Sequence, residues 1–223
     1  MNEETQLYII VPVYNSSKYI LEFIDKIYKS ISDLKMLDKA YIVFCDDAST
    51  DKTVDVIQKE MKKYSLSFKI LQQTKNIGHH DNTLMGILSC PINNYCLTID
   101  ADMQPSPEVL KSFIPYCMKS NKYLVVGDFN PYNWGMRSFV SFVYNIILSV
   151  KIQRNLIRHH GSSLRWIYLN EELKSKLNQD RIDVVLLKYH TAFDFYNIDK
   201  KFLLNRSQHS LLELVKNIFT SAI

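Results

Sequence analysis

The hydrophobic and polar positions of the first 127 residues alternate between two patterns. Nearly continuous apolar runs of strand length occupy residues 7–13, 41–45, 68–71, 95–99 and 123–126. Between them, apolar residues recur at the three- and four-residue spacing of a helix, as they do across residues 17–31. Strands that alternate with helices indicate βαβ units, so we predict an α/β fold with a mostly parallel sheet flanked by helices.

The pattern changes after residue 128. Predicted elements there are helices at residues 138–153, 171–177 and 210–219 and a strand at residues 193–198. The first of these helices has one narrow polar stripe, so it must be buried, paired or in contact with a membrane. Its uncharged part, residues 138–150, would be about 20 Å long, which is too short to span a bilayer of about 30 Å. We therefore divide the chain into a core at residues 1–128 and an amphipathic helical extension at residues 129–223.

The basic residues gather in the same C-terminal part. Residues 134–223 hold 13 Lys and Arg against 7 Asp and Glu, and residues 129–170 hold five basic residues and no acidic one. One interpretation is a basic surface over a packed helix. The other is a surface that binds phosphates or an anionic membrane, because guanidinium groups bind phosphate bidentately and basic amphipathic helices lie among lipid headgroups. The four cysteines lie in apolar runs without CxxC spacing, which predicts buried, reduced thiols of a cytosolic protein and no zinc site.

Polar clusters follow the predicted strands, at the edge where parallel sheets bind ligands. The patterns GxGxxG and GxxxxGK are absent, which argues against a dinucleotide site and a P-loop. The fourth strand is followed by Asp100, Asp102 and Gln104, and side chains two residues apart in an extended segment point to the same side. Two carboxylates and an amide oxygen suit Mg²⁺ or Mn²⁺. The sequence therefore predicts a divalent-metal site that would neutralise a diphosphate, with solvated turn residues as the alternative.

The second strand ends in Asp46 and Asp47. Either carboxylate could accept a hydrogen bond from a nucleobase N–H or cap the next helix, although residues 49–51 are better placed for capping. A phospho-acceptor receiver domain also has acidic residues at strand ends, but on its first and third strands rather than the second and fourth, so we exclude it. His79 and His80 begin the third helix and are interpreted as first-turn residues rather than catalytic ones.

Four motifs stand in order along the first half of the chain. They are IIVPVYN at residues 9–15, CDDASTDKT at 45–53, KNIGHHDNTLMG at 75–86 and LTIDADMQPSPE at 97–108. Together they resemble the successive motifs of the family 2 glycosyltransferases, which have the GT-A (Rossmann-like) fold. The last two look most like the branch that contains dolichol-phosphate mannose synthases and bacterial undecaprenyl-phosphate glycosyltransferases. One departure is Ala48, which stands where the family usually has glycine.

The resemblance implies a role for each matching residue. Contacts to the nucleotide base and ribose would come from Pro12, Tyr14, Asn15, Asp46 and Asp47, and the same pocket would be lined by Lys75, Asn76 and Gly78. Asp100 would lie against the ribose or the diphosphate, and Asp102 and Gln104 would hold the metal. Arg137 would contact a phosphate at the start of the amphipathic helix, and Arg165 is a weaker candidate for the same role.

The implied activity is metal-dependent, inverting transfer of a sugar from a nucleoside-diphosphate sugar to a polyprenyl phosphate. Transfer to a sugar hydroxyl in cell-surface polysaccharide synthesis is the alternative, and a non-catalytic nucleotide-sugar or membrane-binding module is a third. A hydroxyl acceptor needs a general base, whereas a lipid phosphate is already ionised. Possible bases after residue 128 are Glu171, Glu172, Asp180, Asp183 and Asp194. The acid-free basic segment favours the lipid phosphate, so we expect a cytoplasmic protein, peripheral on the inner face of the cell membrane, with no nucleic-acid partner.

Overall fold

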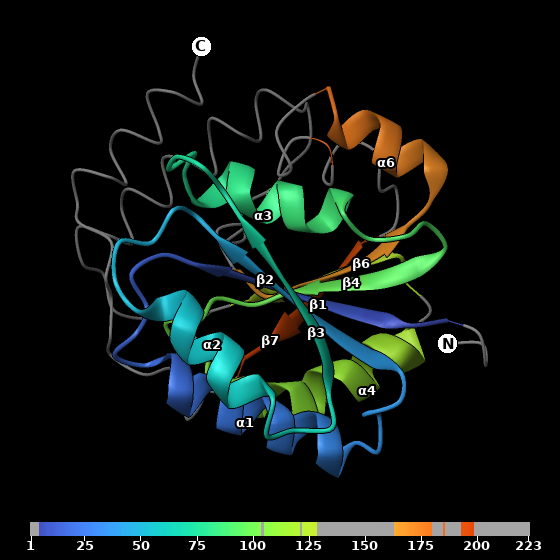
Figure 1. Ribbon diagram of the computed structural model, residues 1–223. Helices are drawn as coiled ribbons and strands as arrows, with labels where there is room; N and C mark the ends of the chain where they lie inside the picture. The colour runs from blue at the N-terminus through green and yellow to red at the C-terminus, as the bar shows by residue number, and fades with distance from the viewer. Residues whose placement is uncertain are drawn as a thin grey trace, which may run out of the picture.

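The computed structural model describes residues 5–103, 105–120, 122–128, 163–179, 185 and 193–198. They form a seven-stranded sheet with helices on both faces (Figure 1). The strands are β1 (Leu7–Val13), β2 (Ala40–Asp46), β3 (Ser67–Gln72), β4 (Asn94–Thr98), β5 (Leu124–Asp128), β6 (Arg165–Leu169) and β7 (Phe193–Asn197). The helices are α1 (Ile20–Asp33), α2 (Thr53–Met61), α3 (His79–Leu88), the 3-10 helix η1 (Pro107–Val109), α4 (Leu110–Ser120) and α6 (Glu171–Leu177). The predicted α/β class with a mostly parallel sheet is confirmed.

The strands lie in the order β3-β2-β1-β4-β6-β5-β7, and all of them except β6 point the same way. Their carboxyl ends therefore lie at one edge of the sheet, called here the carboxyl edge. Strand β6 has no counterpart among the predicted strands and is antiparallel to both β4 and β5. It begins at the carboxyl edge, with Arg165 opposite Thr98, and ends at the far edge, with Leu169 opposite Asn94.

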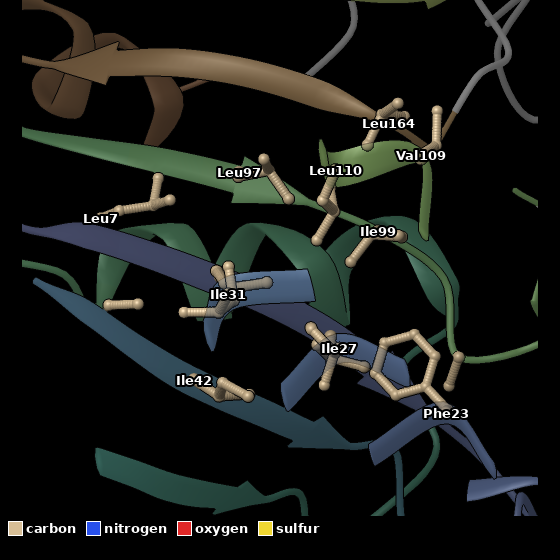
Figure 2. Packing of buried hydrophobic residues seen from close by; sticks show 14 of the residues in the cluster. Leu7, Phe23, Ile27, Ile31, Ile42, Leu97, Ile99, Val109, Leu110 and Leu164 are labelled. Carbon is tan, nitrogen blue, oxygen red and sulfur yellow. The ribbon is translucent and has the colours of Figure 1, made fainter. Parts of the chain in front are cut away.

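The larger hydrophobic core lies between the sheet and helices α1 and α4, with α2 on the same side (Figure 1). Phe23, Ile27 and Ile31 are about one helical turn apart on α1, and all three are fully buried in one cluster with Ile42 and Leu97 of the sheet (Figure 2). Burial of each such side chain contributes about 1.5–3 kcal/mol. Because helices cover both faces, β1 is apolar along almost its whole length rather than alternating.

Helices α3 and α6 cover the opposite face of the sheet (Figure 1). The apolar residues between them and the strands include Cys45, Cys90 and Cys96, while Cys117 lies in the larger core. All four cysteines are buried and form no disulfide, which confirms that they are unpaired core thiols. Burial raises the pKa of the Cys45 thiol to about 12, so that thiol is not ionised at neutral pH.

Gly86 allows α3 to lie directly on the sheet. A Cβ atom at this position would come within 2.5 Å of both Cys45 Sγ and Ile10 Cγ2. Overpacking of this kind costs about 1–3 kcal/mol, whereas alanine gains only about 0.5–1 kcal/mol over glycine from helix propensity. The steric cost therefore outweighs the gain in helix propensity, and alanine at position 86 should destabilise the fold.

We predict that Gly86→Ala lowers the free energy of unfolding by about 1–2 kcal/mol in urea titrations. The double variant Cys45→Ala/Gly86→Ala should recover part of this loss, because it removes one of the two atoms that the new Cβ meets. A stability for Gly86→Ala equal to or above that of the unchanged protein would contradict the close packing of α3.

The C-terminal predictions are met in part by the described residues. The helix predicted at residues 171–177 is α6, and the strand predicted at residues 193–198 is β7. The helices predicted at residues 138–153 and 210–219 lie outside the described residues. In the part of the chain that the structure describes, no helix combines the length and the apolar character that crossing a bilayer requires.

Candidate functional site

Three loops at the carboxyl edge contain residues in the left-handed backbone region. Asn15 after β1 has φ +48°, Ala48 after β2 has φ +60° and Met103 after β4 has φ +67°. Non-glycine residues in this region carry roughly 1–2 kcal/mol of strain, and such strain clusters at functional sites. It also explains why glycine suits the position of Ala48. Lys35 and Asn93, which precede β2 and β4, share this backbone conformation, so strain alone does not single out a site; the loops after β1, β2 and β4 also hold the polar residues predicted from the sequence.

Pro12 and Tyr14 lie at the end of the central strand β1. Ile10 is the last residue of β1 that pairs with β4, and its carbonyl accepts from Ile99. The backbone of Pro12, two residues later, faces the β4 side as that of Ile10 does, but the pairing with β4 has already ended there. Proline has no N–H, and at this position the sheet requires none. Tyr14 follows with 47% of its surface exposed, which leaves its ring open to a ligand at this edge.

Asn15 links the loops after β1 and β2. Its Oδ1 accepts from the backbone N–H of Thr50 at 2.8 Å, and its own N–H donates to Ser49 Oγ at 2.9 Å. The helix predicted across residues 17–31 is α1, which begins only at Ile20 and has no side-chain cap. Asn15 sets the shape of the edge on which a nucleotide would lie.

Asp51 fixes the start of α2. Its Oδ1 accepts from the backbone N–H and the hydroxyl of Thr53, at 2.9 and 2.5 Å, and its Oδ2 accepts from the N–H of Ser17 at 3.1 Å. Burial opposes ionisation of this carboxyl, but the hydrogen bonds from Thr53 and Ser17 outweigh it, so the pKa of Asp51 lies below its usual value. Asp51 thus accepts the hydrogen bonds at the start of α2, as its place in the sequence suggested. Asp46 and Asp47 are not needed there and have other partners.

The two aspartates that end β2 do different things. Asp47 is 3% exposed, and its two carboxylate oxygens accept from the backbone N–H groups of Ile77, at 2.7 Å, and Gly78, at 3.0 Å. Asp46 is 2% exposed; its Oδ2 accepts from Ser49 at 3.2 Å, while its Oδ1 has no partner among the described residues. A buried acceptor without a donor is uncommon, so Asp46 Oδ1 is the oxygen of this pair whose hydrogen bond the described residues do not supply.

The loop of residues 75–78 leads from β3 into α3. Lys75 and Asn76 are exposed, and Gly78 has φ +89°, a conformation that glycine adopts without strain. The start of α3 is held to β2 by Asp47 and also by Asn82, whose Nδ2 donates to the carbonyl of Cys45 at 2.6 Å. The predicted donor-pocket residues of this loop therefore lie beside the end of β2, as the motif order implied.

Asp100 follows β4 on the α3 side of the sheet. Its Oδ1 lies 3.4 Å from His79 Nε2, with the two side chains 21% and 37% exposed respectively. Thr98, two residues earlier on β4, points to the same side of the sheet. The two residues after Asp100 form a turn and Met103 has φ +67°, so the extended row predicted for Asp100 and Asp102 does not continue past Asp100; the Asp102 side chain is partly buried. His79 is a first-turn residue of α3, as the sequence pattern predicts, and its ring also lies beside the carboxylate that the pattern singles out for chemistry.

The residues assigned to a metal are described only in part. Asp100 and Asp102 bring carboxylates to the end of β4, whereas Gln104 lies outside the described residues. Within the described ranges there is no cluster of three or more His, Cys, Asp or Glu side chains that could hold a metal ion. Carboxylate oxygens are nevertheless the ligand type that Mg²⁺ and Mn²⁺ prefer, and both ions retain positions for phosphate oxygens. The oxygen donors after β4 therefore fit such an ion.

Basic residues reach the same edge through β6. Arg165 is the first residue of β6, it pairs with Thr98 and Val126, and it is 7% exposed. The sequence gives it only a secondary role, because nothing in the pattern indicates that residues 165–169 form a strand inside the sheet. Arg137, the main phosphate contact predicted from the sequence, lies outside the described residues.

The described members of the possible general bases after residue 128 lie away from this edge. Glu171 and Glu172 begin α6, directly beyond the end of β6 at the far edge. Asp194 Oδ2 accepts from the hydroxyl of Tyr116 at 2.5 Å, and this hydrogen bond, together with burial, raises the pKa of Tyr116 to about 12. Asp180 and Asp183 lie outside the described residues.

The chain is similar to known proteins both in sequence and in fold. Residues 8–164 match the family model described as Glycosyl transferase family 2. The chain is 28% identical over 120 residues to an undecaprenyl-phosphate 4-deoxy-4-formamido-L-arabinose transferase of Pseudomonas syringae pv. syringae, a match that covers 53% of this chain and 34% of that protein. It is 31% identical over 103 residues to a poly(ribitol-phosphate) beta-N-acetylglucosaminyltransferase of Staphylococcus aureus, covering 46% of this chain and 17% of that protein. The matches thus span about a third or less of these relatives.

The fold is also found in a solved structure. Glucosyl-3-phosphoglycerate synthase from Mycobacterium tuberculosis, in complex with Mn²⁺, uridine diphosphate and glucosyl-3-phosphoglycerate, superposes with a TM-score of 0.63 at 14% sequence identity. The superposition covers 98% of this chain and 77% of that one. The similarity establishes the GT-A type of fold that the sequence motifs predicted.

Proposed function

The chain belongs to glycosyl transferase family 2, and on that premise we propose that it transfers a sugar, with inversion, from a nucleoside-diphosphate sugar to a polyprenyl phosphate. The observation that carries this proposal is the arrangement of aspartates at the carboxyl edge. Asp46 and Asp47 end β2, Asp100 and Asp102 follow β4, and β1 lies between these two strands. One ligand at the end of β1 would therefore reach both acidic pairs.

The base and ribose of the donor would lie over the loops after β1 and β2. Tyr14 offers an exposed ring, and Asp46 Oδ1 offers a buried acceptor without a donor among the described residues. Lys75 and Asn76 are exposed beside this place and would complete the pocket with Gly78. Pro12 and Asn15 would act through the shape of the loop rather than through a free polar group, because Asn15 Oδ1 already accepts from Thr50.

The diphosphate would lie over the end of β4. Asp102 and Gln104 would hold Mg²⁺ or Mn²⁺, which when bound supplies positive charge to the departing diphosphate. Asp100 would orient the ribose or the diphosphate, and Arg137, with Arg165 of β6 nearby at the same edge, would bind phosphate oxygens. Anionic phosphates and carboxylates would thus be balanced by arginines that come from residues after 128. In this proposal, residues 1–128 bind the donor and residues 129–223 bind the acceptor.

The acceptor class follows from the need for a base. An ionised lipid phosphate attacks the anomeric carbon without giving up a proton, whereas a sugar hydroxyl must lose one. Of the candidates after residue 128 that the structure describes, Glu171 and Glu172 lie at the far edge and Asp194 lies near the start of β7, in keeping with an acceptor that needs no base. The basic, acid-free residues 129–170 favour the same choice and a peripheral position on the inner face of the membrane.

A sugar hydroxyl is the second candidate acceptor. One relative is a poly(ribitol-phosphate) transferase, and Asp128 is the last residue of β5, at the carboxyl edge. By its place in the strand, Asp128 is the residue that would serve as base in that case. The two acceptors therefore predict different effects of Asp128→Asn on the transfer rate. The rate should not change with a lipid phosphate, and it should fall strongly with a sugar hydroxyl.

The test begins with nucleoside diphosphates and Mn²⁺. A matching nucleotide at about 100 times its Kd stabilises the fold by about 2.7 kcal/mol, which raises the Tm by about 5–10 °C for a chain of this size.

The transfer test follows. Nucleotide-sugars of the matching base are offered with polyprenyl phosphate in anionic vesicles or with a glycan. Radiolabel should move to the lipid in both the unchanged protein and Asp128→Asn. Binding without transfer to either acceptor would favour a non-catalytic module, and transfer to the glycan alone would overturn the lipid proposal.

A further inference from the structure

His79 and Asp100 come from different strand-helix units and meet at the carboxyl edge. The Nε2 atom of His79 lies 3.4 Å from Oδ1 of Asp100, and neither side chain is fully buried. We propose that His79 is a positioning residue: it holds the Asp100 carboxylate in the orientation that the donor requires. The inference rests on the proposed glycosyl transfer, because it concerns the residue assigned there to the ribose or diphosphate.

The fold fixes where the His79 backbone lies. His79 is the first residue of α3, directly after Gly78, whose N–H is bound by Asp47. Asn82, one turn further along, is 1% exposed and donates to the carbonyl of Cys45 at 2.6 Å. These contacts tie the first turn of α3 to the end of β2. His79 is therefore presented to Asp100 from a rigid element rather than from a loop.

Asp100 needs such a partner because it lies beyond the strand that positions it. It follows the last residue of β4 by two positions, and its carboxylate is 21% exposed. Among the described residues, His79 is the partner of its Oδ1. An N–H of His79 directed at Oδ1 would restrict rotation of the Asp100 side chain. The Nε2–H of a neutral imidazole suffices for this, so the role does not depend on a charged histidine.

The size of the effect follows from what misplacement does to a reaction. A displacement of about 1 Å can cost about 10²-fold in rate. Loss of the His79 side chain leaves the carboxylate present but freer to rotate, so the effect should be smaller than loss of Asp100 itself. We expect a decrease in kcat of about 10- to 100-fold. The KM for the donor should change little, because the base contacts after β1 and β2 are untouched.

The kinetic test compares three variants. His79→Ala should lower kcat with little change in KM, whereas His79→Gln should recover most of the rate, since the glutamine amide nitrogen can occupy the place of Nε2 and donate to Oδ1. Asp81→Ala is the matched control, because Asp81 is an exposed residue on the same helical turn, and it should keep the full rate. Equal losses in His79→Ala and His79→Gln, or a loss that falls on KM alone, would overturn the proposal.

A spectroscopic test separates this proposal from that of glycosyl transfer. In protein labelled with ¹⁵N-histidine, the signals of His79 are identified by their absence from His79→Gln. At a fixed pH well above the usual pKa of histidine, Asp100→Asn should move the Nε2 signal of His79 more than that of any other histidine. This result can be obtained even if no acceptor is turned over. An unchanged His79 signal would show that the two side chains do not interact, whatever the activity.

Discussion

Replacement of Asp102 by asparagine is expected to lower the rate of sugar transfer by about 10³-fold, equivalent to about 4 kcal/mol of transition-state stabilisation. The reason is that the amide keeps the shape of the side chain but carries no negative charge for Mg²⁺ or Mn²⁺. Asp102 lies in the turn after β4 and is only partly buried, so the free energy of unfolding should change by less than about 1 kcal/mol. Initial rates at saturating donor, with unfolding in urea measured alongside, check both parts.

Binding of the metal gives an independent measurement. In the unchanged protein, Mn²⁺ should increase the stabilisation by a nucleoside diphosphate, since a ligand that binds only the folded state raises the Tm. In Asp102→Asn the increment due to Mn²⁺ should disappear, while the smaller effect of the nucleotide alone remains. Asp55→Asn is the matched control, because Asp55 is an exposed aspartate on α2. If Asp102→Asn retained the full rate and the Mn²⁺ increment, the metal assignment would be wrong.

The part of the site that can be predicted from sequence is the part set by strand ends. Apolar runs locate β1, β2 and β4 to within a residue or so, because strands buried on both faces must be continuously apolar. Parallel strands then place their carboxyl ends together, and this is why the sequence alone assigns Asp46 and Asp100 to one edge of the sheet. The prediction needs no side-chain contact, only the direction and order of the strands.

Strand β6 cannot be predicted in the same way. Its sequence, RWIYL, begins with a charged residue, and it follows a long segment of different character. Its place in the sheet, antiparallel between β4 and β5, depends on pairing between residues that are far apart in the chain, such as Thr98 and Arg165. No local pattern encodes such a pairing. The sequence therefore does not show that Arg165 begins a strand at the carboxyl edge.

The contact between His79 and Asp100 escapes prediction for a different reason. A histidine in the first turn of a helix has no special pattern, and the helix position alone does not tell which neighbouring strand it faces. The orientation of α3 on the sheet depends on Gly86, which lets the helix approach Cys45 and Ile10. The signal that could reveal the contact is the combination of this glycine with a polar first turn.

The Asp46-Asp47 pair shows how the same residue type can have two roles. In the sequence the two carboxylates are equivalent candidates for a nucleobase. In the structure the backbone alternates, so Asp47 faces α3 and binds the N–H groups of Ile77 and Gly78, while Asp46 Oδ2 accepts from Ser49. Side-chain direction at the end of a strand therefore separates a residue that holds the loop before α3 from one that contacts the loop after β2.

Removal of the Asp47 carboxylate is expected to have the largest effect on stability of any substitution at the carboxyl edge. Asp47→Ala should lower the free energy of unfolding by about 3 kcal/mol, because hydrogen bonds to charged groups contribute about 1.5–3 kcal/mol each and both oxygens are engaged. The estimate stays near the lower end because Ile77 and Gly78 are only partly buried, so water can reach their N–H groups. Unfolding in urea measures the change.

The matched control for this substitution is Asp81→Ala. Asp81 is an exposed aspartate in the first turn of α3, where a carboxylate interacts with the helix dipole for about 0.3–1 kcal/mol. A cost for Asp47→Ala no larger than this would mean that the carboxylate does not hold the loop.

The same substitution should also affect the rate. Because α3 carries His79, Asp47→Ala should lower kcat, and the double variant with His79→Ala should lose less than the product of the two single effects. Such non-additivity is expected because both changes act on the same carboxylate, that of Asp100, whereas two independent defects would multiply.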